Sequence, residues 1–258
     1  MTPIEIFALG GASVLAGAVN SVAGGGTLLS FPAAIAVGLP PIVANASNAV
    51  AMTPGSLASA WGYRRELRQD RPVVRLLVPP AVLGGLCGAL LLLATPQRVF
   101  DAVVPILVLL AAGLLLVQNL RPRPSGSDAA ADERWILPTR TSASLGLQFL
   151  VGVYGGYFGA GMGIMTLALL SMLNGRNIHR MNGVKIVLGA FVNGFAAAGF
   201  ALANAVDWRA TGVMAVGVSL GGWGGAALAR KLDDRLVRWV VVVVAVGIAV
   251  LLARKTWL

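Results

Sequence analysis

The sequence predicts an all-α polytopic membrane protein: an inverted repeat of two five-segment halves, with eight full transmembrane helices and two re-entrant half-helices. Of its 258 residues, 57% are hydrophobic and 12% are charged, whereas average soluble domains carry about 25% charged residues. Apolar runs long enough to cross about 30 Å of hydrocarbon recur from end to end. Two glycine clusters, at 24–26 and 155–163, each interrupt an apolar stretch. Because glycine disfavours a helix interior by roughly 1 kcal/mol relative to alanine, we expect two broken helices.

Five apolar runs divide the first half, separated by polar residues, glycines or prolines: 4–22, 28–37, 42–63, 73–94 and 100–120. The second of these runs has about ten residues, too few to span a bilayer as a helix that rises about 1.5 Å per residue. It is expected to be a half-helix. The stretch 121–140 combines prolines, serine, glycine and mixed charges, a composition typical of a solvated linker.

The second half repeats this order with the runs 142–158, 164–173, 181–205, 210–229 and 236–253. When the halves are aligned 135 positions apart, glycines of the two clusters coincide, and Asn48 falls on Asn182 once the offset is relaxed by one. Internal duplication is the economical explanation. The expected organisation is a first repeat at 1–120, a cytoplasmic linker at 121–140 and a second, inverted repeat at 141–258.

The placement of arginines predicts the orientation. The formal net charge is +10, and the arginines sit in short connections between apolar runs, the distribution that the positive-inside rule produces. The most basic connection, at 64–71, is therefore expected in the cytoplasm together with the linker, and both termini are expected outside. Each glycine-centred pair of segments must then enter and leave on one side, and the two halves must have opposite orientations. Basic charge in this distribution does not indicate a nucleic-acid partner.

The starts of the two half-helices are the candidate binding site. A helix N-terminus presents N–H groups without intrahelical partners and about half a positive charge, which suits an oxyanion. Two such ends facing each other would replace much of an anion's hydration shell. The alternative is that the glycines only permit tight helix packing. Backbone donors are expected at Gly24, Gly25, Gly26 and Thr27 in the first hairpin and at Gly159, Ala160, Gly161 and Gly163 in the second.

Polar side chains within the apolar segments extend this candidate site. Asn20 precedes the first glycine cluster, and Asn48 and Asn182 are related by the repeat, so both are expected to face one cavity. Lys185 carries the only charge in its apolar run, and an ionisable group inside a membrane segment is a functional candidate. The alternatives are interhelical hydrogen bonds for the asparagines and snorkelling to the interface for Lys185. Tyr154 flanks the second cluster and is expected to wall the cavity.

Catalytic and metal-binding signatures are missing from the sequence. It contains neither His-Glu-x-x-His nor a phosphate loop that ends in Gly-Lys-Ser/Thr. Cys87 is the single cysteine, which excludes an internal disulfide and a multi-cysteine metal site. We therefore expect neither an enzyme nor a cofactor.

Two stretches resemble the TauE/SafE family of sulfite exporters, also called toluene sulfonate uptake permeases. The first is Gly-Ala-Val-Asn-Ser-Val-Ala-Gly-Gly-Gly-Thr at 17–27, followed by Phe-Pro at 31–32; the second is the glycine cluster at 155–163, followed by Asn-Gly-Val-Lys at 182–185. The resemblance covers nearly the whole chain outside the linker. It implies a bacterial inner-membrane permease for sulfur-containing anions such as sulfite, sulfoacetate or other organosulfonates, with export a common assignment.

The sequence thus predicts a secondary transporter, an exporter, that carries a small sulfite or sulfonate anion by alternating access around a midplane site. The membrane potential favours export, because it drives an anion outward with about 2.3 kcal/mol per charge per 100 mV. Two alternatives stay open: a membrane partner subunit without transport of its own, and a passive anion channel. The compound, the coupling ion and the oligomeric state stay undetermined, with a homodimer as one option.

Overall fold

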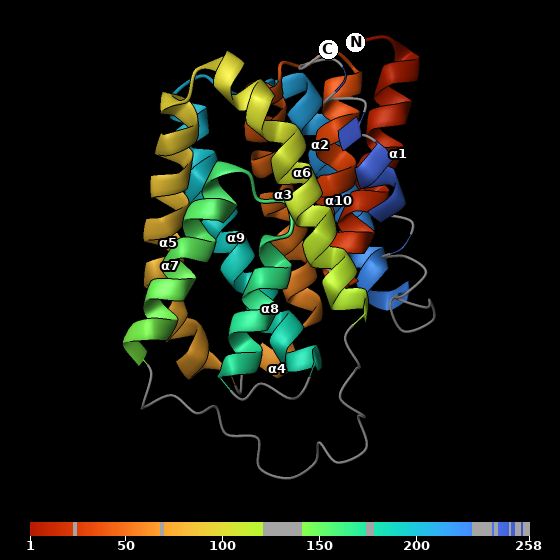
Figure 1. Cartoon of the computed structure of the whole chain (residues 1–258). Coiled ribbons are helices and arrows are strands. Elements are labelled where there is room, and N and C mark those ends of the chain that lie inside the picture. The colour runs from red at the N-terminus through yellow and green to blue at the C-terminus, as the bar shows by residue number, and fades with distance from the viewer. Residues whose placement is uncertain are drawn as a thin grey trace.

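The computed structural model describes residues 1–22, 25–67, 70–120, 141–173 and 178–228, with residues 239, 242–247, 249–250 and 254 near the C-terminus. Within these residues the chain is helical between short connections and contains no β-strand (Figure 1). This confirms the all-α class. The helices are α1 (Pro3–Val22), α2 (Thr27–Ala36), α3 (Pro41–Gly62), α4 (Arg64–Leu67), α5 (Arg71–Ala94), α6 (Gln97–Leu120), α7 (Thr141–Tyr157), α8 (Met162–Met172), α9 (Ile178–Leu202) and α10 (Trp208–Leu228).

The helix bounds follow the predicted apolar runs closely. Both short runs form short helices, α2 and α8, which begin at Thr27 and Met162, directly after the glycines. Helices α5 and α6 begin at Arg71 and Gln97, two or three residues before the predicted runs 73–94 and 100–120. The residues added at these starts are mostly exposed and need no apolar side chains. The basic connection also contains α4, a single helical turn that hydropathy does not indicate. The last run is described only in part, and the linker 121–140 lies outside the described residues.

Four of the described helices are long and apolar enough to cross a membrane, judged by length and composition: Pro3–Ser21 in α1, Arg71–Ala94 in α5, Gln97–Val117 in α6 and Arg180–Leu202 in α9. Helices α3 and α10, with 22 and 21 residues, have comparable lengths. Their composition differs, because α3 buries asparagines and serines and α10 is rich in glycine. The described helices therefore indicate a multi-pass membrane protein, in which composition alone identifies fewer spans than the eight predicted.

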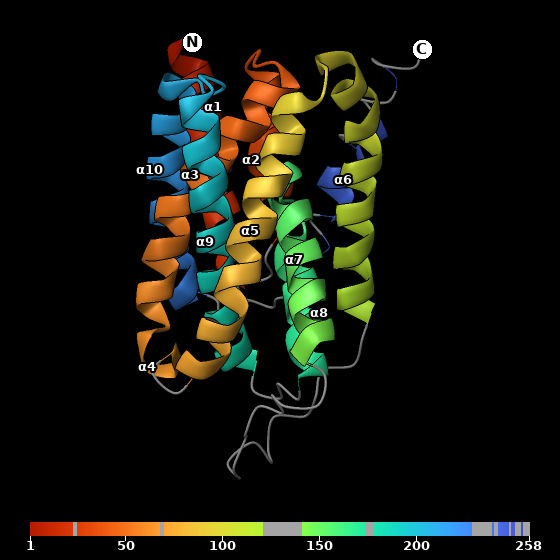
Figure 2. The same ribbon diagram turned by 90° about the vertical axis from the view of Figure 1, so that its left-hand side faces the viewer.

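The two short helices enter the bundle from opposite ends. In Figure 1, α1 descends from the top and α2 returns upward, whereas α7 rises from the bottom and α8 returns downward. Helices α3 and α9 pack against each other in the middle of the bundle, and α1 packs along α10. Figure 2 shows α5 between α7 and α9, against both of which it packs. Each half of the chain is thus packed against the other along several helices.

Glycines allow these helix pairs to approach at backbone distance. A Cβ atom built at Gly221 of α10 would lie 1.9 Å from the carbonyl oxygen of Val14 in α1. A Cβ at Gly84 of α5 would lie 2.2 Å from the carbonyl oxygen of Phe149 in α7. Small residues commonly mediate such close packing in membranes, where apolar side chains gain nothing by leaving lipid for a neighbouring helix.

Replacing Gly221 by alanine is expected to lower the stability of the protein, because the added methyl group would collide with the backbone of α1. Overpacking of this kind costs about 1–3 kcal/mol. The measurement is the melting temperature of the purified protein in detergent. Gly212 in the same helix is the matched control, since a Cβ there meets nothing within 4 Å, and alanine should raise stability by about 0.5–1 kcal/mol. Equal melting temperatures for the two variants would contradict the packing.

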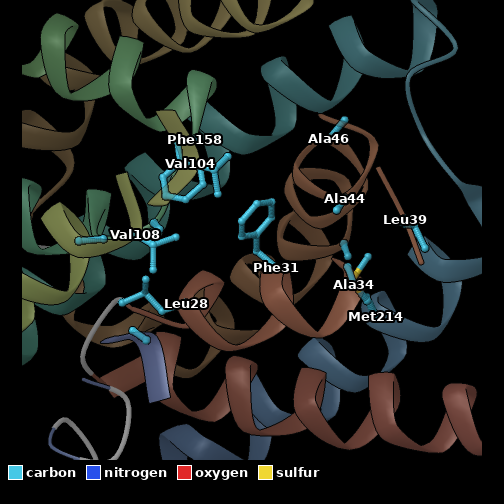
Figure 3. Close-up of a cluster of buried hydrophobic side chains, with 14 of the residues drawn as sticks. Leu28, Phe31, Ala34, Leu39, Ala44, Ala46, Val104, Val108, Phe158 and Met214 are labelled. Atoms are coloured by element: carbon cyan, nitrogen blue, oxygen red, sulfur yellow. The ribbon is translucent and has the colours of Figure 1, made fainter. Parts of the chain in front are cut away.

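Two hydrophobic cores position the hairpins. The larger core lies where α2, α3 and α6 meet the loop before α8, and Figure 3 shows Leu28, Phe31 and Phe158 within it. The second core joins α5, α7, α8 and α9 around Leu77 and Leu188. The first core therefore lies between the two half-helices, α2 and α8. The second core packs the hairpin of α7 and α8 against α5 and α9.

Candidate functional site

The second hairpin breaks at a loop that requires glycine. The helix α7 ends at Tyr157, and both Gly159 and Gly161 have φ of +79°, in the left-handed region that favours glycine. The hydroxyl of Tyr154 donates to the carbonyl oxygen of Ala160 at 2.6 Å. Tyr154 therefore holds the loop in place, and the Ala160 carbonyl is engaged by that hydroxyl.

Of the four amides that the sequence predicts as donors in the second hairpin, that of Gly159 is used locally, because it donates to the carbonyl oxygen of Tyr154 at 3.1 Å. The amide of Met162 donates to the carbonyl oxygen of Gly159 at 3.2 Å. The amides of Ile164 and Met165 both donate to the carbonyl oxygen of Gly161, at 2.9 and 3.3 Å. Among the described residues, no backbone carbonyl oxygen accepts from the amides of Ala160, Gly161 or Gly163. Three of the four predicted donors, at Ala160, Gly161 and Gly163, therefore remain candidates for binding an anion.

The first glycine cluster serves packing at the positions that the structure describes; Gly24 lies outside them. A Cβ at Gly26 would lie 2.1 Å from the carbonyl oxygen of Ala16 and 2.8 Å from the Cβ of Asn20. A Cβ at Gly25 would lie 2.7 Å from Cδ1 of Leu115 in α6. These contacts support, for Gly25 and Gly26, the alternative that the glycines permit close helix packing, and they place the half-buried Asn20 beside Gly26.

Aromatic side chains join the two hairpins. The rings of Phe31 in α2 and Phe158 in the second loop meet edge to face, with centroids 5.3 Å apart and an interplanar angle of 84° (Figure 3). Phe100 of α6 packs against Tyr157 and Phe158 in the same way. The side-chain amide of Asn45 donates to the carbonyl oxygen of Tyr157 at 2.9 Å. The contact between the hairpins is therefore largely apolar in this structure.

Buried polar side chains form two groups, and those of the first group, around Asn48, bond to one another. Asn48 is 2% exposed, and its Oδ1 accepts from the Ser30 hydroxyl at 2.5 Å. Its Nδ2 donates to the Thr27 hydroxyl at 3.4 Å. The structure thus brings together two predicted residues, Asn48 and Thr27, through interhelical hydrogen bonds between α3 and α2. Ser30, which the sequence analysis missed, had a signal in its position one turn after Thr27 on the half-helix.

The second polar group lies in α7 and α9 and contains two amide oxygens without a local partner. Asn182 and Lys185, one turn apart in α9, are 7% and 3% exposed, and Gln148 in α7 is 1% exposed. No described residue donates a hydrogen bond to Oδ1 of Asn182 or Oε1 of Gln148. Buried polar atoms are nearly always satisfied in folded proteins. Gln148 was missed by the sequence analysis, although it is the only amide side chain in the run 142–158.

The half-helices α2 and α8 differ in the side chains of their first turns. At an offset of 135 positions, Thr27 and Ser30 correspond to Met162 and Met165. The hydroxyl groups that satisfy Asn48 are therefore replaced by thioethers, which cannot donate a hydrogen bond. The amide oxygen of Asn182 is left to accept from something other than the half-helix.

Positive charge and the start of α8 lie on the same side of α9. A Cβ at Gly189 would lie 3.4 Å from Cε of Met162, the first residue of α8. Lys185 lies one turn before Gly189, and its burial argues against snorkelling as the reason for its presence. The N-terminal end of a helix carries about half a positive charge. The ammonium group and the helix end are therefore two sources of positive potential on one side of α9.

Comparison with known proteins identifies the family. The family described as Sulfite exporter TauE/SafE matches residues 9–252. The chain is 29% identical over 251 residues, covering 95% of its length and 88% of the relative, to the probable membrane transporter protein YfcA of Escherichia coli (strain K12). It is 28% identical over 256 residues, covering 95% of this chain and 91% of the relative, to the probable membrane transporter protein ORF9 of Sinorhizobium sp.

A probable membrane transporter protein of Haemophilus influenzae is 27% identical over 228 residues, which cover 88% of this chain and 86% of that relative. No solved structure shows significant similarity to the chain. The family match extends over nearly the whole helical bundle, from α1 to the described residues near the C-terminus. The chain therefore belongs to the TauE/SafE sulfite exporter family of membrane transporters.

Proposed function

We propose that the chain is a secondary transporter that exports small sulfur-containing anions, such as sulfite or an organosulfonate, by alternating access. The observation that carries the proposal is Lys185, a cation 3% exposed within a membrane helix. Ionisable groups at such depth are expensive and mark substrate pathways. Membership of the TauE/SafE family supports transport, and the positive end of α8 beside α9 supports an anion as cargo.

An inverted repeat of eight full spans and two half-spans is part of this proposal. Under the repeat, α1 corresponds to α7, and α10 corresponds to α5. The pairing of α1 with α10 therefore corresponds to that of α7 with α5, and both pairs are packed through glycines. Likewise, the packing of α3 on α10 corresponds to that of α9 on α5. These paired contacts support the proposal that the two halves share one helix arrangement, as in transporters built from inverted repeats.

Charge at the two ends supports the orientation. At the lower end in Figure 1, the described charged residues include four arginines, Arg64, Arg71, Arg75 and Arg180, and one aspartate, Asp70. At the other end, the described charged residues are more evenly matched, with Glu5, Asp101 and Asp207 set against Arg98, Arg209 and Arg254. We assign the lower end to the cytoplasm and the upper end to the outside of a bacterial inner membrane, following the positive-inside rule. An anion then moves outward down the membrane potential.

Ligand-dependent stabilisation of the purified protein tests the proposal. A ligand that binds the folded state at 100 times its Kd stabilises it by about 2.7 kcal/mol. Sulfite or 2-hydroxyethanesulfonate should therefore raise the melting temperature in detergent, and uncharged dimethyl sulfone at equal concentration should not. In proteoliposomes, an internal load of unlabelled anion should drive saturable uptake of the labelled one, as expected of a carrier and not of a passive channel. Failure of every sulfur anion in both assays would contradict the proposal.

A further inference from the structure

Two buried oxygen atoms in the second half lack a donor, and their counterpart in the first half does not. The oxygens are Oδ1 of Asn182 and Oε1 of Gln148, in side chains that are 7% and 1% exposed. Leaving a buried acceptor without a hydrogen bond has a substantial free-energy cost. Asn48, related to Asn182 by the repeat, has both Ser30 and Thr27 as partners. The asymmetry points to a role for the second group in binding rather than in folding.

Helix geometry sets these side chains at the same level of two neighbouring helices. Helices α7 and α9 run in the same direction in Figure 1, and they approach where a Cβ at Gly155 would lie 2.9 Å from Cγ1 of Val192. Two turns earlier on the same faces lie Gln148 and Lys185. Asn182 precedes Lys185 by one turn on that face. Asn182 and Lys185 therefore lie one turn apart on α9, and Gln148 lies at the matching level of α7.

An anion alone would satisfy only part of this cluster. The oxygens of a sulfonate or sulfite accept hydrogen bonds and suit the ammonium of Lys185, but they repel the lone pairs of amide oxygens. An amide oxygen requires an N–H or O–H group. When buried acceptor atoms of a site receive no hydrogen bond from the protein, the site rejects a ligand analogue that lacks a donor. The acceptor atoms would then stay unsatisfied in the complex.

We propose that the transported solute is a small anion that carries its own hydrogen-bond donor, a hydroxyl or an amine. Its anionic group faces Lys185, and its donor is accepted by Asn182 Oδ1 and Gln148 Oε1. This inference rests on the anion transport proposed above and narrows its substrate class. It distinguishes hydroxy- or amino-substituted sulfonates and protonated sulfite from sulfonates whose other end is a methyl group.

A pair of sulfonates with equal numbers of heavy atoms tests the inference. 2-Hydroxyethanesulfonate and 1-propanesulfonate differ in that a hydroxyl replaces the terminal methyl group. Isothermal titration of the purified full-length protein should give a Kd about tenfold lower for the hydroxyl compound, the effect of one hydrogen bond to a buried acceptor. Equal affinities would overturn the inference and leave the anion proposal intact. If neither compound binds, and no other sulfur anion binds either, the result would instead count against the transport function itself.

Variants of similar shape supply a readout that needs no ligand. Asn182→Leu and Gln148→Met each remove an unsatisfied oxygen, so the empty protein should melt higher by roughly 2–4 °C. Both should also reduce the preference for the hydroxyl compound towards unity. Asn48→Leu is the matched control, and it should lower the melting temperature because it removes the bonds to Ser30 and Thr27. A lower melting temperature for Asn182→Leu and Gln148→Met as well would show that their oxygens are satisfied within the fold, and would overturn the inference.

Discussion

Replacing Lys185 by methionine is expected to weaken the binding of sulfite or of a sulfonate by roughly 10- to 100-fold, the effect of losing one hydrogen bond to a charged group. Lys185 is 3% exposed, so its ammonium acts on an anion without much screening by water. Methionine has a similar length and no charge. The variant should stay folded, because methionine fills a similar volume and suits a buried site.

Titration calorimetry of the purified variant measures this loss. Lys185→Arg is the matched control, since it keeps the positive charge and should retain most of the affinity. The melting temperature of both variants without ligand reports whether the fold is intact. Unchanged affinity in a folded Lys185→Met protein would remove this residue from the site and return the question to the hairpin loops.

Arg180→Gln is expected to cause the largest loss of stability, about 3–5 kcal/mol, because it removes the arginine that pairs with a buried carboxylate. The Nε of Arg180 donates to both carboxylate oxygens of Asp70, at 3.0 and 3.2 Å. Its Nη2 also donates to Oδ1 of Asp70. The side chain of Asp70 is fully buried, whereas that of Arg180 is 16% exposed. Asp70→Asn should therefore be milder, because the arginine that remains has access to solvent.

Chemical denaturation of the two single variants and of the double variant separates the pair from its surroundings. The double variant should lose less stability than the sum of the single losses, as expected of directly interacting residues. Arg75→Gln is the control, since this exposed arginine lies near the same end of α5 and its loss should change stability by less than about 0.5 kcal/mol. Additive losses, or an equal effect of Arg75→Gln, would contradict the importance of the buried pair.

The same ion pair connects the two halves at the end assigned to the cytoplasm. Asp70 precedes α5 of the first half, and Arg180 lies in the first turn of α9 in the second half. Nearby, a Cβ at Gly183 would lie 3.3 Å from Cβ of Tyr63. Under the proposed alternating access, opening toward this end requires the separation of these contacts.

The helices could be predicted from the sequence because their cause is local. Apolar runs and the glycines that interrupt them are visible in the sequence itself. Helices α2 and α8 begin at Thr27 and Met162, as these interruptions indicate. The buried face of α3 was harder to predict. Its asparagines and serines lower the hydropathy of a helix long enough to span, and their burial depends on partners such as Ser30 and Tyr157 that lie far away in sequence.

The site could be predicted only in part, because glycine and tyrosine have more than one use. Gly26 matched an anion-binding pattern, yet it packs against Ala16. Tyr154 was expected to wall a cavity, and it donates to Ala160 to fix the loop. Lys185 stays a predicted site residue, since an ionisable group within an apolar run is a functional candidate. The difference between Asn48 and Asn182 depends on hydroxyl partners, which only the structure reveals.

The most direct measurement of the central claim is the position of a bound anion within the protein. Crystals of the full chain soaked with 3-bromo-2-hydroxypropanesulfonate, which carries the hydroxyl that the site is proposed to accept, would show the bromine by its anomalous scattering and the sulfonate near it. We predict a sulfonate oxygen within about 3 Å of Nζ of Lys185, between α7 and α9. A sulfonate bound elsewhere, with the space around Lys185 empty, would contradict the account.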